Sequence, residues 1–320
     1  MTQIYEAERS REVHPDIALI EGFLRDCELR RLSPETIVGY RSSLGIVSRL
    51  LHEKALFMDS LDRNALTEVL KYLVGEGYVY NTLVQYFSAL SGFCDYLVWE
   101  GVAQANPIAP FRKRYIRQYK GQHDPERKLI SVEEMAMLVN SILDPRDKAL
   151  VMLLAKTGIR RGELIKIDVD DIDWVEQSIM LKPHPKRSSC IVFFDDECAR
   201  ILRRWIKARE EYGVEQACRA LFVNEQRGRL KRHGVDHAVT KHAVRIGLHD
   251  SKSKRIEDHF TPHCCRHWFT THLRRNNMRR ELIQELRGDA RREAMDIYDH
   301  IDKKELKRAY LAAIPVLGIG

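Results

Sequence analysis

The chain has 320 residues, of which 44% are hydrophobic and 31% are charged, a balance typical of a folded globular protein. This length exceeds what a single hydrophobic core usually serves, so we expect two domains. The 53 lysines and arginines outnumber the 46 acidic residues, and the net charge of +7 favours a polyanionic partner. A merely basic protein is the alternative, because charge alone does not identify a ligand.

Several classes of protein are excluded by the residue pattern. The sequence has no apolar run of the roughly 18 residues that a membrane span needs, and no secretory signal follows Met1. The seven cysteines form no framework and no Cys-x-x-Cys pair, so we expect a reduced, cytoplasmic protein without a membrane partner. Cys264 and Cys265 lie near histidines, but neighbouring residues on a helix point about 100° apart. We therefore predict no metal site.

Residues 15–111 are predicted to form a small domain of four helices. Ser33 and Pro34 supply an N-cap and a first-turn proline for the second helix, and Asn106-Pro107 ends the fourth. Four apolar stripes with helical spacing run through this region. They are Ile17, Ile20, Phe23 and Leu24; Tyr40, Leu44, Val47 and Leu51; Leu66, Val69, Leu70 and Leu73; and Leu83, Phe87, Leu90, Phe93 and Leu97.

Residues 112–130 are predicted to be a basic linker, exposed because Gly121 and Pro125 interrupt it. As a solvated connector it would need no function. Between two domains that enclose a duplex, its cations would lie along the phosphates and contribute through counterion release, which we favour. The residues expected to contact DNA are Arg112, Lys113, Arg114, Arg117 and Lys120.

A second domain is predicted over residues 131–320, beginning with a helix start at Ser131. A buried helix over 150–155 leads to Arg160. Two strands, 178–181 and 190–194, are joined by a turn over 184–189. Further helices are expected at 198–209, 235–244, 266–275, 280–286, 290–299 and 303–312. The fold class is thus mainly α, with a small antiparallel sheet in the second domain.

Three motifs in this second domain carry the chemistry. Arg160 follows Gly158, which permits a tight turn, and precedes Glu163, which is placed to orient a guanidinium. His263 and Arg266 lie one helical turn apart and share a face near a helix N-terminus, which favours an anion. Two guanidiniums can hold one phosphate, and a nearby tyrosine hydroxyl can attack it and form a covalent ester. Each arginine alone would be an ordinary surface residue.

These motifs resemble those of the tyrosine recombinase (phage integrase) family, and the helical region before them resembles the SAM-like core-binding domain of that family. The resemblance implies that Arg160 and Arg266 bind the scissile phosphate, that His263 takes part in proton transfer, and that His267 supports it. Trp268, Phe269 and Leu273 would then face the core. No cofactor is implied.

The resemblance also implies a tyrosine nucleophile and a general-acid lysine. Tyr298 follows Leu286-Arg287-Gly288-Asp289 by nine residues, and His300 comes two residues later, as in the family pattern. Tyr310 has no such motif before it and no such histidine after it. On the predicted hairpin Lys182 and Lys186 both qualify, and Lys186, nearer the tip, is preferred. Its task would be protonating the departing 5′-oxygen.

Asp289 stands where the family usually has His or Trp. A carboxylate about 4 Å from a phosphate would be repelled by roughly 4 kcal/mol at an effective dielectric constant near 20. We therefore expect Asp289 to support the site, as an N-cap for the tyrosine helix or by holding an arginine such as Arg266 in position. This variant motif resembles integrases of archaeal viruses and plasmids.

The predicted function is site-specific recombination, as in provirus integration and excision, through a 3′-phosphotyrosyl intermediate. The implied partners are double-stranded DNA with attachment sites, three further copies of the chain in a homotetramer, and accessory proteins. Two alternatives are a type IB topoisomerase-like or telomere-resolving enzyme, and a non-cleaving DNA-binding regulator with a decayed site. The apolar end of the chain, Ile314 to Ile319, is expected to dock on a neighbouring subunit, with packing on its own domain as the alternative.

Overall fold

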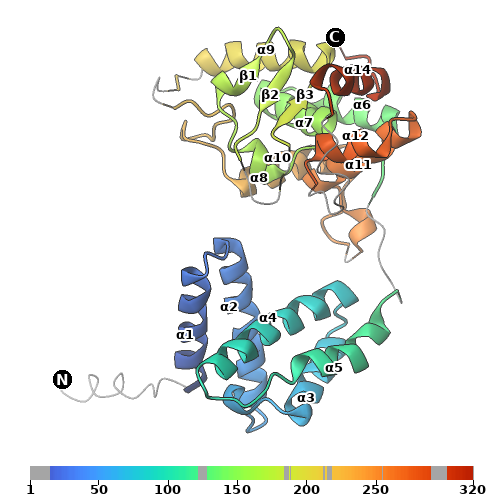
Figure 1. Ribbon diagram of the computed structural model, residues 1–320. Helices are drawn as coiled ribbons and strands as arrows, with labels where there is room; N and C mark the ends of the chain where they lie inside the picture. The colour runs from blue at the N-terminus through green and yellow to red at the C-terminus, as the bar shows by residue number, and fades with distance from the viewer. Residues whose placement is uncertain are drawn as a thin grey trace, which may run out of the picture. The chain divides into compact units, whose positions relative to one another are not determined.

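The computed structural model describes residues 15–121, 128–183, 187, 189–211, 213–214, 218–253, 255–289 and 301–319. The chain divides into two compact units, one up to residue 124 and one from residue 125 (Figure 1). The described part has no helix with the length and apolar character that a bilayer span requires.

The N-terminal unit is helical, as predicted, and consists of α1 (Pro15–Leu29), α2 (Pro34–His52), α3 (Arg63–Gly75), α4 (Tyr80–Trp99) and α5 (Ile108–Arg114), with the 3-10 turns η1 (Met58–Ser60) and η2 (Ile116–Tyr119). Helix α2 begins as expected, because the Ser33 side chain accepts a hydrogen bond from the Thr36 amide at 3.2 Å. It packs against α1, α3 and α4. Phe23, Leu44 and Phe87, from three of the predicted stripes, are fully buried between them.

The basic stretch after residue 111 differs from the predicted linker. Residues 108–119 form α5 and η2 and belong to the N-terminal unit. The reason is apolar anchoring: Phe111 stacks on Phe87 with ring centroids 5.4 Å apart, and Ile116 is buried beside it. The sequence pattern did not indicate that Phe111 and Ile116 would be buried, because basic residues surround them. The charges are consequently held on an ordered surface.

The second unit is built around α7 (Pro145–Thr157), a helix buried along most of its length. It follows α6 (Val132–Ser141), which starts with the expected capping box between Ser131 and Glu134. Helices α9 (Asp196–Glu211) and α11 (Pro262–Arg275) pack directly on α7. This packing explains why the middle of α7, residues 149–155, is apolar on all sides, since a helix covered by neighbours needs no polar face.

A small antiparallel sheet lies beside these helices, with strand order β1-β2-β3 (Figure 1). Strands β2 (Ser178–Met180) and β3 (Ile191–Phe193) are the two predicted strands, paired with Ile179 opposite Val192. The additional strand β1 (Ile172–Asp173) pairs with β2. Two residues are too few to show an alternating pattern, so β1 could not be predicted from the sequence.

The remaining elements complete this unit around the end of α11. They are α8 (Arg161–Leu164), η3 (Val169–Asp171), α10 (Arg232–Arg245), η4 (Ile256–Asp258), α12 (Arg280–Arg287) and α14 (Lys303–Ala313). The predicted helices over 235–244, 280–286 and 303–312 are confirmed by α10, α12 and α14. The predicted helix over 290–299 falls outside the described residues.

The apolar end of the chain packs on its own unit. Ile314, Leu317 and Ile319 are buried, and the carboxylate of Glu197 accepts hydrogen bonds from the amides of Leu317 at 2.8 Å and Ile319 at 2.9 Å. Lys156, which has no solvent exposure, donates to Glu197 at 2.8 Å and also to Asp195 and the Pro315 carbonyl. The structure therefore shows packing of the tail on its own unit, the alternative to the expected docking on a neighbouring subunit.

We predict that Lys156→Met lowers the free energy of unfolding by roughly 3–5 kcal/mol, because it leaves the buried carboxylates of Asp195 and Glu197 without their cation. Urea denaturation monitored by circular dichroism measures the change. Lys166→Met is the matched control, since Lys166 is exposed, and it should change the value by less than about 0.5 kcal/mol. Equal stability of the Lys156 variant and the wild type would contradict the prediction.

Candidate active site

Arg160 is placed by the turn that ends α7. Gly158 caps this helix in the left-handed conformation, with φ of 60°. A side chain there would also collide with the core, because an added Cβ would lie 2.4 Å from Cδ1 of Phe269. The chain then turns, and Arg160 becomes the N-cap residue of α8 with extended backbone angles. Glycine is therefore favoured at position 158 for two reasons, its left-handed backbone and the lack of space for a side chain.

Arg266 reaches the same turn from α11. Its Nη1 donates to the Gly158 carbonyl at 2.7 Å, and the residue is only 4% exposed. Helix α11 begins four residues before the predicted bound of 266, with Thr261 as N-cap and Pro262 in the first turn. The predicted core residues Trp268, Phe269 and Leu273 are all buried. Packing of this apolar face thus fixes where the arginine emerges.

His263 and His267 lie on the same helix as Arg266. His263 is in the first turn of α11 and exposed to solvent, and His267 is half-buried one turn further on. With Arg266 between them in the sequence, the three side chains lie within two turns of one helix. An exposed imidazole at a helix N-terminus is accessible to a bound ligand.

Glu163 lies between two arginines. Its Oε1 accepts from Arg160 Nη1 at 3.2 Å and from Arg187 Nη1 at 3.1 Å, and its Oε2 accepts from the Arg160 amide at 2.7 Å. Burial raises the pKa of Glu163, but the charges of Arg187 and Arg160 and the hydrogen bonds outweigh it, so the pKa lies below its usual value. The carboxylate is therefore ionised at neutral pH and forms an ion pair with Arg160.

Arg187 was not among the predicted site residues. A basic residue in a turn beside Lys186 is usually exposed, and nothing in the sequence distinguishes it from its neighbours. In the structure its side chain has no solvent exposure and lies against Glu163. Only the tertiary contacts identify it.

Asp289 joins the two arginines that flank the site. Its Oδ1 lies 3.3 Å from Arg160 Nη2 and 3.0 Å from Arg266 Nη2, and its Oδ2 lies 3.1 Å from Arg287 Nε. Of the two supporting roles expected for Asp289, the structure contains the ion pair with Arg266. The N-cap role concerns residues 290–299, outside the described part of the chain.

The cluster as a whole is positive. Four guanidiniums, those of Arg160, Arg187, Arg266 and Arg287, meet the two carboxylates of Glu163 and Asp289. Burial, followed by the charges of Arg160 and Arg287, lowers the pKa of Arg266 to about 10. This value is far above neutrality, so Arg266 remains a cation. The excess positive charge makes the cluster a site for an anion.

Of the two candidate lysines, the structure describes only Lys182. Lys182 is exposed and forms ion pairs with Asp171 at 2.7 Å and Asp168 at 3.2 Å, and these carboxylates raise its pKa. Lys186 lies outside the described residues. The preference for Lys186 stays a prediction.

The two candidate tyrosines also differ. Tyr310 is fully buried, and its hydroxyl donates to the Lys156 carbonyl at 2.9 Å. Burial raises its pKa far above the usual value, so this tyrosine is not available as a nucleophile in this conformation. Tyr298 lies outside the described residues.

Cys264 and Cys265 are both buried, and burial raises the pKa of Cys265 well above the usual range. Among the described residues, histidine, cysteine, aspartate and glutamate side chains form no group of three that could hold a metal ion.

Comparison with known proteins assigns the family. Residues 128–305 match the model of the phage integrase family, and residues 20–101 match that of its N-terminal SAM-like domain. The chain belongs to the phage integrase family. It is a tyrosine-type site-specific recombinase, with a helical SAM-like domain followed by the catalytic domain. The narrower resemblance to archaeal integrases stays a prediction.

Known recombinases resemble the chain over nearly its whole length. Tyrosine recombinase XerC of Psychromonas ingrahamii is 28% identical over 303 residues, 93% of this chain and 96% of the relative. Tyrosine recombinase XerD of Oceanobacillus iheyensis is 28% identical over 305 residues, 92% of this chain and 98% of the relative.

Solved structures show the same fold. The Tn1549 transposon integrase, in complex with a circular intermediate DNA, gives a TM-score of 0.69 at 15% identity over 91% of this chain and 97% of that chain. A lambda integrase dimer bound to a COC′ core site gives 0.66 at 17% identity over 90% of this chain and 98% of that chain.

We predict that Asp289→Asn keeps DNA cleavage within about tenfold of the wild-type recombinase, about 1.4 kcal/mol in activation free energy, because the side-chain oxygen can still accept from the guanidiniums. Single-turnover cleavage of a nicked substrate that traps the covalent adduct measures the rate. Asp289→Ala should lose about 1 kcal/mol of unfolding free energy, the upper range for partly exposed ion pairs.

The control is Asp236→Asn, which breaks the exposed ion pair with Arg161 and should leave cleavage unchanged. A thousandfold loss for Asp289→Asn, with folding and DNA binding intact, would show that the carboxylate itself takes part in the reaction.

Proposed function

We propose that Arg160 and Arg266 bind the scissile phosphate of double-stranded DNA and that Tyr298 is the nucleophile. The observation that supports this is the pair of guanidiniums that meet one oxygen of Asp289 at 3.3 and 3.0 Å. Two arginines held this close to one anionic oxygen have the spacing for a non-bridging phosphate oxygen. Their charge would stabilise the additional negative charge of the pentacoordinate phosphate.

In the reaction the Tyr298 oxygen forms a bond to phosphorus, and the bond between phosphorus and the 5′-oxygen breaks. The tyrosine loses its proton, with His263 taking part in the transfer, and the 5′-oxygen gains one from Lys186, or from Lys182 as the alternative. The products are a 3′-phosphotyrosyl ester and a free 5′-hydroxyl. Attack by a 5′-hydroxyl of a partner strand reverses the steps and releases the tyrosine.

The exchange of strands needs two DNA sites and four active tyrosines, so we propose a homotetramer on attachment sites, aided by accessory proteins. The Tn1549 and lambda integrases that share the fold were solved with DNA. Because the ester stores the energy of the broken bond, the chemistry as proposed consumes no ATP.

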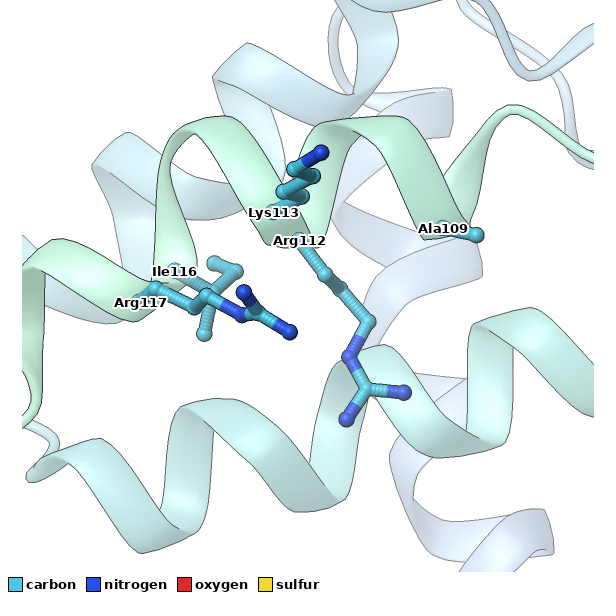
Figure 2. Close-up of a pocket in the computed structure, with 5 residues that line it drawn as sticks. All are labelled: Ala109, Arg112, Lys113, Ile116 and Arg117. Atoms are coloured by element: carbon cyan, nitrogen blue, oxygen red, sulfur yellow. The ribbon is translucent and has the colours of Figure 1, made fainter.

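The basic surface of α5 and η2 is proposed to bind the DNA backbone. A pocket of about 310 Å³ is lined there by Ala109, Arg112, Lys113, Ile116 and Arg117. Figure 2 shows the guanidiniums of Arg112 and Arg117 projecting toward the same space, while Lys113 extends in another direction. Two adjacent guanidiniums on an ordered surface can contact neighbouring phosphates without base specificity. Arg114 and Lys120 are also exposed on this stretch.

We predict that Arg112→Ala and Arg117→Ala each weaken binding of all DNA sequences alike and each reduce the slope of log K against log salt by about 1. Fluorescence anisotropy over a salt series measures both effects. Lys71→Ala is the control, because Lys71 is exposed on α3 and paired with Glu68, and it should not alter the slope. Unchanged slopes for both arginine variants would remove this surface from the DNA interface.

The test of the function is the adduct. Tyr298→Phe should bind DNA as the wild type does but form no covalent complex, whereas Tyr310→Phe, which loses only a buried hydroxyl, should still form one. Mass spectrometry of the trapped complex locates the tyrosine. An adduct at Tyr310 would contradict the assignment.

The adduct assay tests one alternative function, and a recombination assay on supercoiled DNA with two sites tests the other. Wild-type protein that binds DNA and never forms an adduct would point to the non-cleaving regulator. Relaxed circles without recombinants would point to the topoisomerase-like enzyme.

A further inference from the structure

Arg187 is a buried cation in the segment between β2 and β3. Basic residues there are normally solvated, yet its side chain is 0% exposed. Burying a guanidinium is unfavourable unless its donors find acceptors. The position is therefore maintained by specific partners, and these partners belong to the active site.

The donors of Arg187 reach three segments of the chain. Its Nη1 lies 3.1 Å from Glu163 Oε1 and 3.2 Å from the Arg287 carbonyl, its Nη2 lies 2.8 Å from the Leu286 carbonyl, and its Nε donates to the Ser189 carbonyl. The carbonyls of residues 286 and 287 end α12, where they lack partners within the helix and where a cation is favoured. Arg187 thus connects the segment before β3 to α8 and to the end of α12.

The Arg187 side chain also packs closely against Gly288. Its φ is 61°, and an added Cβ would lie 2.4 Å from Cγ of Arg187 and 2.8 Å from its Nε. The stem of Arg187 therefore lies directly on the backbone that leads into Asp289. Movement of Arg187 would move the end of α12 with it.

Arg187 shares its acceptors with the two phosphate-binding arginines. Glu163 Oε1 also accepts from Arg160, and the Arg287 carbonyl also accepts from Arg160 at 3.5 Å and Arg266 at 3.0 Å. We propose that Arg187 is a positioning residue of the recombinase: it fixes Glu163 and the end of α12, and through them the guanidiniums of Arg160 and Arg266. The inference rests on the proposed role of these two arginines. Because it is fully buried, Arg187 itself does not touch the phosphate.

The test compares two DNA substrates, one with a normal scissile phosphate and one with a neutral methylphosphonate at that place. Arg187→Lys keeps the charge but cannot serve the same set of acceptors. We expect DNA affinity within threefold of the wild type and cleavage of the phosphate at least about 100-fold slower, the usual effect of a small displacement. On the methylphosphonate the deficit should fall below about tenfold, because less negative charge then needs the two arginines.

A purely structural defect would slow both substrates equally, and that result would overturn the proposal, as would cleavage of the phosphate at the wild-type rate. If Arg187→Lys fails to fold, Gly288→Ala takes its place, since it displaces the Arg187 stem and keeps the guanidinium. It should show the same difference between substrates. The matched control is Arg209→Lys, which alters another arginine bound to backbone carbonyls and should leave both rates unchanged.

Arg160→Ala separates this inference from the proposed function. Relief of its defect on the methylphosphonate supports the phosphate-binding role. No relief for Arg160→Ala would refute that role, whereas relief for Arg160→Ala without relief for Arg187→Lys would refute the positioning role alone.

Discussion

The carbonyl oxygen of Arg287 is the point on which the active site depends. Guanidiniums of Arg160, Arg187 and Arg266 all donate to it, at 3.5, 3.2 and 3.0 Å. It is the last carbonyl of α12, where the partial negative charge of a helix end is concentrated. Three like charges converge there only because this carbonyl and the carboxylates of Glu163 and Asp289 offset their repulsion. The arrangement holds the three guanidiniums in place without a ligand, which would lower the cost of binding the proposed phosphate.

Close packing beneath this cluster determines where the arginines emerge. Gly158 allows the end of α7 to lie on Phe269 of α11, and Arg266 of the same helix donates to the Gly158 carbonyl. Helices α7 and α11 are thereby held together by an apolar contact on one side and a charged one on the other. The buried ion pairs of Lys156 with Asp195 and Glu197 hold the end of the chain onto this unit. Buried charged groups thus hold both the candidate site and the helices around it in this unit.

Much of the fold could be read from local patterns. The helices of both units have apolar periodicity, N-caps such as Ser33 and Ser131, and prolines in the first turn, all of which act within a few residues. The exceptions are short or hidden elements. Strand β1 has two residues, and α5 is anchored by Phe111 and Ile116, which stand among cations. Their conformation depends on distant partners, such as Phe87 on α4, that local periodicity does not reveal.

The sequence by itself indicated which residues make up the proposed site, because Arg160, Glu163, His263 and Arg266 stand in short motifs. Only the tertiary structure decided how they are held. The burial of Arg187, and the contacts of Asp289 with Arg160 and Arg266, join segments more than 20 residues apart. A sequence does not distinguish an arginine or a carboxylate that will be buried from one that will be exposed. Their role is set by the neighbours that folding brings to them.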